Sequence, residues 1–326
     1  MKINIDWVMA HGDSDGICSA AIALSAFRDA RLFFSHPVGL ATDLRQVDGN
    51  LLVVDIALPS KDLQEVIGEL RRISDAGNKI IYIDHHPYPP NFSPEDFPGE
   101  FIHSLNASAS ELTFFRLRSH LDPHMSRVAI YGAIGDYLDR TYNMERLLEF
   151  WDKRLLYLES GLLVQAIESM GRNHDAKREL ARYLSENNLP SADEKIVKRA
   201  ISETIVEEDM RKVIEAEAKV VGNIAYVIDL KWSLGKSAIY ARAAKNVMVG
   251  VGAESRKDFV DMSLRTPIER LELNKAVIEI AGRIGGSGGG HAKAAGARVP
   301  RERFKEFLEE LNSAIVNKTR NKTVEY

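Results

Sequence analysis

The chain has 326 residues, of which 45% are hydrophobic and 28% charged, the composition of a soluble globular protein with room for two domains. Its longest apolar runs are far shorter than the roughly 20 residues that are needed to cross a bilayer, so we expect that the protein does not bind membranes. Residues 1–16 do not have the pattern of a secretory signal, and the single cysteine, Cys18, fits a reducing compartment, so we expect a cytoplasmic protein. The formal net charge of −4 is divided unevenly, because residues 1–210 carry 22 basic and 33 acidic side chains whereas residues 211–326 carry 21 and 14.

In the first half of the chain, predicted strands alternate with predicted helices. Apolar strands are predicted at residues 7–13, 31–36, 50–58 and 78–84, and helices at 16–30, 60–77, 109–121, 127–139 and within 144–185. Ser60 is predicted to be the N-cap of the second helix. Near-continuous apolar strands separated by helices indicate an α/β domain with a doubly wound, mostly parallel sheet that helices cover on both faces.

The rest of the chain is predicted to form a linker and a smaller domain. Residues 186–218 are polar and helix-prone, which is typical of a linker with helical content. Beyond them, strands are predicted at 223–230, 246–253 and 258–265, and helices at 236–245, 272–283 and 301–316. We therefore place a first domain at residues 1–185, a helical linker at 186–218 and a small mixed α/β domain at 219–326.

Three of the predicted strands end in acidic or imidazole side chains. These residues are His11, Asp13, Asp15, Asp55, Asp84, His85 and His86. One aspartate alone can be a helix N-cap or part of a turn, and a histidine pair alone can be a loop feature. Three strand ends of a parallel sheet meet at one edge, however, and carboxylates gathered there repel one another unless cations lie among them. Oxygen and imidazole ligands suit Mn²⁺, so we expect two divalent metal ions, with Mg²⁺ or Co²⁺ as alternatives.

These strand ends resemble the ordered motifs of the DHH phosphoesterase superfamily. The resemblance is carried by "HGDSDG", the isolated Asp55, "DHH" and Asp136 in "GAIGDYLD". The superfamily includes RecJ-type exonucleases, nanoRNases, cyclic-dinucleotide phosphodiesterases and family II inorganic pyrophosphatases. The resemblance implies that the metal ligands are His11, Asp13, Asp15, Asp55, His85 and Asp136, with Asp55 bridging two ions.

The resemblance also assigns catalytic roles, and it has one departure. It implies that His86 touches the scissile phosphate and that Asp84 supports the histidines, which would fix the orientation of a ligating ring. Many members place the first histidine four residues before the first aspartate, where this chain has Met9. His11 instead lies two residues before Asp13.

A glycine-rich stretch at residues 284–299 lies near the end of the chain. Glycines let backbone N–H groups approach an anion closely, and His291 and Lys293 can add contacts to a phosphate, whereas a flexible linker would have a similar composition. The stretch resembles the GGGHxxAAG motif of the domain that accompanies the DHH domain, and Ser263-Leu264-Arg265 resembles its S-x-R strand. The resemblance implies a RecJ-like or nanoRNase-like member, and it implies that the residues that bind the substrate are Ser263, Arg265, Gly288, Gly289, Gly290 and His291.

The resemblance and the charge distribution together predict a Mn²⁺-dependent phosphodiesterase. We expect a RecJ-like exonuclease that acts in DNA repair and hydrolyses single-stranded DNA or short RNA or DNA oligonucleotides to mononucleotides, by in-line attack of water at two metal ions. Tyr88, Phe92 and Phe97 can stack on bases or pack within a loop. The alternatives are a phosphodiesterase for cyclic dinucleotides or other small phosphates, and an inactive replication or repair scaffold. A homo-oligomer and a replication or repair protein are the protein partners we consider.

Overall fold

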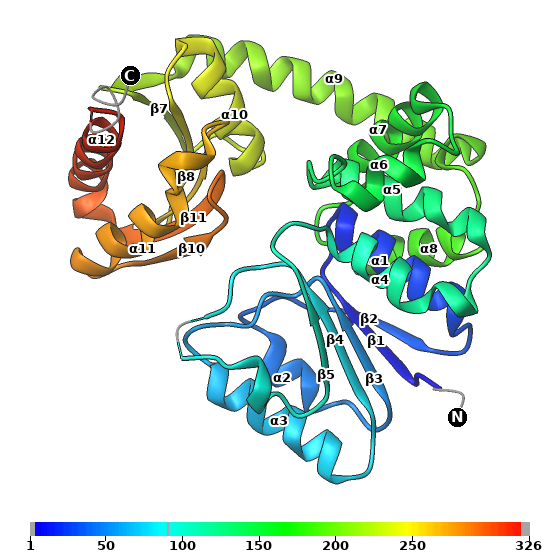
Figure 1. The fold of residues 1–326 in the computed structure, drawn as a ribbon. Coiled ribbons are helices and arrows are strands. Elements are labelled where there is room, and N and C mark those ends of the chain that lie inside the picture. Colours follow the sequence, from blue (N-terminus) through cyan, green and yellow to red (C-terminus); the bar gives the residue numbers. More distant parts are fainter. Residues whose placement is uncertain (1–3, 90, 321–326) are drawn as a thin grey trace. The chain divides into compact units, whose positions relative to one another are not determined.

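The computed structural model describes residues 4–89 and 91–320 (Figure 1). The chain divides into two compact units, Met1–Thr204 and Ile205–Tyr326, and each is described by itself. Among the described residues, no helix is both long and apolar enough to pass through a membrane.

The first unit is built on a five-stranded sheet in which every pair of neighbouring strands is parallel. Its strands are β1 (Trp7–Ala10), β2 (Arg31–Phe34), β3 (Leu51–Val54), β4 (Ile80–Asp84) and β5 (Glu100–His103). Their order is β2-β1-β3-β4-β5, so the three strands that precede the predicted ligands are adjacent (Figure 1). The predicted parallel sheet is therefore confirmed.

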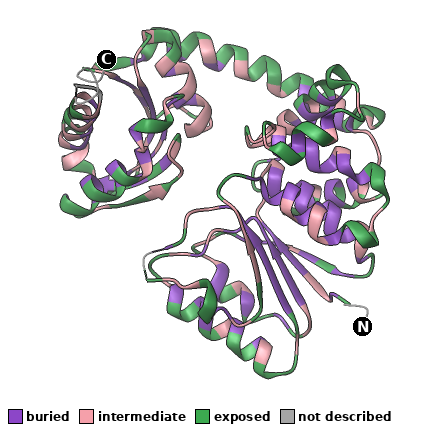
Figure 2. Cartoon of the chain, viewed as in Figure 1, coloured by how far each residue is buried: buried purple, intermediate pink, exposed green. Residues whose placement is uncertain are grey.

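Helices cover both faces of this sheet. The helices of the first unit are α1 (Ser14–Ala26), α2 (Leu40–Leu44), α3 (Leu63–Asp75), α4 (Ala109–Leu117), α5 (Ser126–Gly135), α6 (Tyr142–Leu148), α7 (Lys153–Met170) and α8 (His174–Ser185). Successive strand residues point to opposite faces. Leu52 accordingly packs in a core with α1, α4 and α5, whereas Val53 packs in a second core with α2 and α3. Figure 2 shows β3 and β4 as buried along their length.

Two details of the first unit differ from the sequence prediction. The prediction that Ser60 caps α3 is wrong, because the helix begins at Leu63 and its N-cap residue is Asp62. The short helix α2 and the edge strand β5 were not predicted. Both are only four or five residues long, and β5 mixes charged and apolar residues, so neither shows a clear hydrophobic period.

The second unit contains a six-stranded mixed sheet, which confirms the predicted smaller α/β fold. Its strands are β6 (Lys219–Val221), β7 (Ile224–Ile228), β8 (Val249–Ser255), β9 (Phe259–Arg265), β10 (Ser287–Gly290) and β11 (Ala294–Pro300), in the order β10-β11-β9-β8-β7-β6. Only β7 and β8 pair in parallel among these described strands. The helices are α10 (Leu234–Lys245), α11 (Leu273–Arg283) and α12 (Phe304–Arg320), and α9 (Glu194–Glu217) contains the boundary between the units.

The glycine-rich stretch forms two strands rather than a flexible linker. β10 pairs antiparallel with β11, and Gly288 lies opposite Ala297. A Cβ atom at Gly288 would lie 2.4 Å from Cγ1 of Val277, so the absence of a side chain lets α11 pack closely on the hairpin.

The described residues also form short 3₁₀ helices. These lie at Pro94–Asp96, Arg118–His120, Pro123–Met125, Pro190–Ala192, Glu269–Leu271 and Arg301–Arg303.

Candidate metal centre

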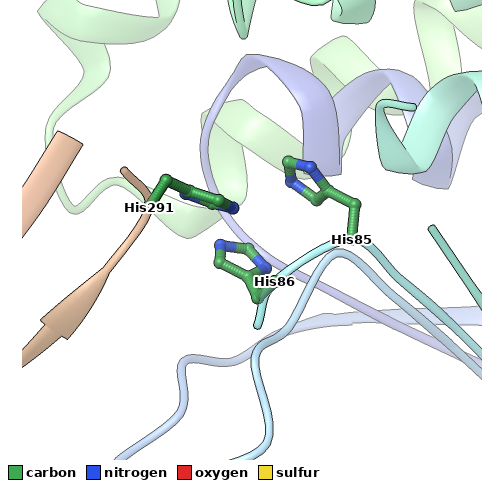
Figure 3. Close-up of side chains that lie close together, drawn as sticks. All are labelled: His85, His86 and His291. Carbon is green, nitrogen blue, oxygen red and sulfur yellow. The ribbon is translucent and has the colours of Figure 1, made fainter. Parts of the chain in front are cut away.

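Most of the predicted site residues of the first unit lie at or beyond the carboxyl ends of three adjacent strands. His11 and Asp13 follow β1, and Asp55 follows β3 directly. Asp84 ends β4, and the side chains of His85 and His86 follow it (Figure 3). The parallel order of β1, β3 and β4 therefore brings them to one edge of the sheet.

Asp55 is the residue that the candidate metal groups share. Within the first unit, three groups each offer ligand atoms that lie within 4.8 Å of one another: His11, Asp13 and Asp55; Asp15, Asp55 and His85; and Asp55, Asp84 and His86. Asp55 is 2% exposed and has a φ of 60°, a left-handed conformation that aspartate tolerates better than most residues. Asp55 is thus the carboxylate that these three groups have in common.

Short distances connect Asp55 to the remaining predicted ligands. Nε2 of His85 lies 3.2 Å from Oδ1 of Asp55, 3.5 Å from Oδ2 of Asp136 and 3.9 Å from Oδ2 of Asp15. Nδ1 of His11 lies 3.9 Å from Oδ2 of Asp55. The structure thus brings together every residue that was predicted from the sequence as a metal ligand.

His11 takes part in the group despite its unusual spacing. Its Nδ1 lies 2.8 Å from Oδ2 of Asp13. Against the effect of burial, His11 lowers the pKa of Asp13, and the charge of Asp13 raises the pKa of His11. Met9 is buried in the core with α2 and α3. The spacing of two residues places His11 beside the carboxylates, whereas position 9 belongs to the core.

Backbone N–H groups orient Asp15. Its Oδ2 accepts a hydrogen bond from the N–H of Ala109 (2.6 Å), and its Oδ1 accepts one from the N–H of Ser110 (3.0 Å). Both donors lie in the first turn of α4, where the helix dipole also favours a negative charge. The carboxylate of Asp13 accepts a hydrogen bond from the N–H of Gly16 and so caps α1. Asp13 therefore both caps α1 and belongs to one of the candidate metal groups.

Close packing of α5 brings Asp136 to the group. A Cβ atom at Gly132 would lie 2.4 Å from Oγ of Ser110 and 2.8 Å from Oδ1 of Asp15. Only glycine therefore allows α5 to approach α4 and Asp15 so closely. Asp136 is the residue that directly follows this helix.

The electrostatics of the group favour a bound cation. Burial raises the pKa of Asp55 well above its usual range, and the carboxylates of Asp13, Asp15 and Asp136 raise it further. Burial also raises the pKa of Asp15, although His85 opposes this effect. Oδ2 of Asp55 is buried and accepts no hydrogen bond from the described residues. Buried carboxylates and imidazoles with such an acceptor fit hard divalent ions such as Mn²⁺ or Mg²⁺.

Asp84 and His103 hold the histidine loop. Oδ1 of Asp84 lies 2.8 Å from Nδ1 of His86, and Nε2 of His103 lies 2.6 Å from the carbonyl oxygen of His86. Burial lowers the pKa of His86, but the hydrogen bond and charge of Asp84 outweigh it, so the pKa is raised overall. Of the two histidines that Asp84 was predicted to support, His86 is therefore the one whose ring it orients through a hydrogen bond.

Two residues near the site were not predicted from the sequence. The buried carboxylate of Glu111 accepts hydrogen bonds from Oγ1 of Thr141 (2.7 Å) and Nδ2 of Asn143 (2.9 Å), and so holds the segment that follows Asp136. The S-x-x-E pattern of Ser108 and Glu111 marks the start of α4, but it does not indicate the distant partners of the Glu111 carboxylate.

The second unpredicted residue is Lys177 of α8. Its Nζ donates a hydrogen bond to the carbonyl oxygen of Gly12 (2.6 Å), although the two residues are 165 positions apart. Lys177 lies within a charged, amphipathic helix, so nothing in the sequence distinguishes it from an exposed lysine.

The aromatic residues that follow β4 pack mainly on one another. Phe97 is buried, and its ring centroid lies 5.5 Å from that of Tyr82. Phe92 packs against Phe101 at 5.3 Å. Tyr88 is 44% exposed and lies 4.2 Å from the ring of His103, so among these three candidates it is the one with substantial exposed surface for stacking.

In the second unit, the predicted substrate residues line neighbouring strands. Ser263 pairs with Gly296, and Gly296 pairs with Gly289, so these three residues form a row across β9, β11 and β10. Gly288 points instead toward α11, which gives it a packing role. Gly290 has a φ of 119°, and it precedes the tight turn in which the N–H of His291 donates to the carbonyl oxygen of Ala294 (2.8 Å).

Arg265 lies beside the first turn of α10. Its Nη1 donates hydrogen bonds to Oγ of Ser263 (2.7 Å) and to the carbonyl oxygen of Leu264 (2.9 Å). A Cβ atom at Gly235 would lie 2.9 Å from Nη2 of Arg265. A guanidinium next to a helix N-terminus is an arrangement that can bind a phosphate.

Two family models match separate segments of the chain. The model of the DHH family N-terminal domain matches residues 7–135, and the model of the DHHA1 domain matches residues 205–317. A search of curated proteins found no match.

Solved structures share the fold at low sequence identity. A DHH domain described as a member of a family of ribosomal proteins is 14% identical, with a TM-score of 0.69 over 96% of this chain and 87% of that chain. RecJ from Thermus thermophilus in complex with Mn²⁺ is 18% identical, with a TM-score of 0.64 over 95% of this chain and 52% of that chain, about half of RecJ. A pGpG-specific phosphodiesterase, PggH from Vibrio cholerae, is 14% identical, with a TM-score of 0.59 over 96% and 99%. The chain therefore belongs to the DHH superfamily and carries both a DHH domain and a DHHA1 domain.

Proposed function

We propose that this protein is a metal-dependent phosphodiesterase that removes mononucleotides from one end of single-stranded DNA or short oligonucleotides. The observation that carries the proposal is the convergence of buried carboxylates and histidines on Asp55. Such a group repels its own charges unless divalent cations neutralise them, and two such ions suit in-line attack on phosphorus. RecJ from Thermus thermophilus was solved in complex with Mn²⁺ and with Mg²⁺, so we consider both ions as candidates for this site.

The side chains of the first unit have distinct tasks in this proposal. A pair of divalent ions, when bound, supplies a nucleophile at neutral pH and stabilises charge on the phosphate and the leaving oxygen. Asp55, which three of the candidate metal groups share, would hold the ions together with His11, Asp13, Asp15, His85 and Asp136. Asp84 holds His86 through Nδ1, and we assign Nε2 of His86 to the contact with the scissile phosphate.

The second unit contributes the residues that bind the substrate. Residues 205–326 carry 21 basic and 17 acidic side chains, an excess of positive charge that favours attraction of a polyanion. Arg265 at the N-terminus of α10 is suited to a phosphate, and the row of Ser263, Gly296 and Gly289 leaves space for a nucleotide. A second candidate substrate is a short dinucleotide, because the similarity to PggH extends over 99% of that chain.

The test is a time course on short single strands of RNA and DNA labelled at the 5′ or the 3′ end, with pGpG in parallel, in Mn²⁺ and in EDTA. A ladder from one label and immediate mononucleotide from the other would establish an exonuclease and its direction. Cleavage of pGpG alone would select the dinucleotide. No hydrolysis in Mn²⁺ would contradict an enzymatic role and favour a scaffold.

A double variant ties this activity to the site. Asp84→Ala combined with His85→Ala is expected to abolish hydrolysis while the chain stays folded by circular dichroism. Asp75→Ala combined with His124→Ala is the matched control, because both residues are exposed and lie outside the metal groups. Turnover that persists in the first variant would contradict the metal-centred mechanism.

A further inference from the structure

We propose that Lys177 is a positioning residue that fixes the loop carrying His11 and Asp13 in the geometry required for metal binding. The inference rests on the proposed metal centre and adds a residue from α8 to it. Lys177 is 9% exposed, and its Nζ donates to the carbonyl oxygen of Gly12 at 2.6 Å. Gly12 is the residue between the two predicted ligands, so this bond anchors the backbone from which both side chains extend.

The surroundings of α8 hold the lysine in place. Leu180, Ala181 and Leu184 of α8 are buried in the same core as the apolar side chains of α1. The helix that carries Lys177 is thus fixed against the helix that Asp13 caps. Cδ of Lys177 would lie 3.7 Å from a Cβ atom at Gly12, so the stem of the side chain packs against the loop as well.

The choice of partner distinguishes positioning from simple charge neutralisation. Lys177 hydrogen-bonds a backbone carbonyl, whereas the carboxylate of Asp13 is bonded to Nδ1 of His11 and the N–H of Gly16. A lysine that served only to balance the carboxylates would gain more from an ion pair with Asp13. A charge-assisted bond to a carbonyl oxygen fixes the direction of the peptide groups, and the direction of these groups sets where the two ligands point.

The two roles predict opposite effects on metal affinity. If Lys177 acts only through its charge, its removal must strengthen Mn²⁺ binding, because a positive group near the cation is lost. If Lys177 positions the loop, its removal must weaken Mn²⁺ binding. Loss of groups that orient metal ligands typically weakens affinity by roughly 10–100-fold. The sign of the change therefore decides between them.

The experiment measures Mn²⁺ affinity by electron paramagnetic resonance on the full chain without substrate. Lys177→Met is expected to weaken Mn²⁺ binding by roughly tenfold or more. Lys177→Arg keeps a cationic donor and is expected to restore most of the affinity. The matched control is Arg182→Met, an exposed cation on the same helix, which is expected to leave the affinity unchanged.

The outcomes separate this inference from the proposed function. Unchanged or tighter Mn²⁺ binding in Lys177→Met would overturn the positioning role while leaving the metal centre intact. A wild-type chain that binds no Mn²⁺ would overturn the metal centre itself. Circular dichroism establishes that each variant is folded, and Lys177→Gln replaces Lys177→Met in the comparison if the methionine variant does not fold.

Discussion

At the scale of single residues, Asp55 combines two unfavourable features at one position. It is a buried carboxylate in a left-handed conformation, and burial and its acidic neighbours raise its pKa well above the usual range. Because the pKa is raised on folding, the ionised form of Asp55 destabilises the metal-free protein at neutral pH. Such strain is characteristic of functional sites, where a ligand restores the balance.

Asp55→Asn should therefore stabilise the metal-free protein and abolish the effect of metal. Asparagine is neutral and tolerates a left-handed conformation, so we expect a gain of about 1 kcal/mol in EDTA, which corresponds to a rise in Tm of roughly 2–4 °C. Addition of Mn²⁺ should raise the Tm of the wild type but not that of the variant. Thermal denaturation followed by circular dichroism measures both quantities.

The control for this prediction is Asp75→Asn, at an exposed position at the end of α3. It is expected to change the Tm very little in either condition. If Asp55→Asn lowers the Tm in EDTA, or if Mn²⁺ still stabilises it as much as the wild type, the description of Asp55 as a destabilising metal ligand is wrong.

The residues that could be predicted are those whose chemistry is visible locally. Asp84 and His85 end an apolar run, and an acidic group at the end of a buried strand is conspicuous in the sequence. Lys177 and Glu111 could not be found in this way, because their roles depend on Gly12, Thr141 and other partners that are distant in the chain. Long-range contacts of this kind follow from how helices pack, which a hydrophobic period does not specify.

At the scale of elements, the strands that were predicted have a recognisable local sequence, whereas the strands that were missed depend on contacts with a neighbouring strand. β3 and β4 are continuous apolar runs and are recognisable alone. β10 consists of one serine and three glycines, residues that seldom form strands, and it is a strand because β11 provides its hydrogen-bonding partner. A hydrophobic pattern read within one segment misses a strand that forms only because a partner strand pairs with it.

The pairing of β9 with β11 has a charged component that should depend on pH. Arg298 lies opposite Asp261, donating from Nε to Oδ1 (2.5 Å) and from Nη2 to Oδ2 (2.8 Å). The hydrogen bond from Arg298 lowers the pKa of Asp261, burial opposes this, and Arg256 lowers the pKa further. The stabilisation is therefore complete above the unfolded pKa of about 3.9 and is lost as pH falls through the lower folded value.

Asp261→Asn should accordingly lower stability at pH 7 by about 1 kcal/mol, with a difference from the wild type that shrinks toward zero near pH 2. Urea denaturation at a series of pH values measures this. Asp258→Asn, in the exposed turn between β8 and β9, is the control and should show no such dependence. A difference that is constant with pH, or that grows as pH falls, would show that the ion pair does not stabilise the strands.

At the scale of the whole molecule, the proposal divides the work between a unit that holds metal and a unit that binds phosphate. The uneven distribution of charge along the chain already indicated this division. The cluster of carboxylates and histidines around Asp55 lies within the first unit. Arg265 and the first turn of α10 lie within the second unit. A substitution in the second unit should therefore weaken substrate binding without changing the affinity for metal.

Arg265→Ala makes this division measurable on a short oligonucleotide. Loss of a charge-assisted contact to phosphate costs about 1.5–3 kcal/mol, so KM should rise by roughly 10–100-fold, while kcat changes little because the contact serves binding more than the chemical step. The Kd for Mn²⁺ should equal that of the wild type. Arg283→Ala is the control, because its guanidinium pairs with Glu310 on the surface of the same unit. A fall in kcat with an unchanged KM would instead mean that Arg265 acts in the chemical step, and a weaker Kd for Mn²⁺ would mean that the two units do not divide the work.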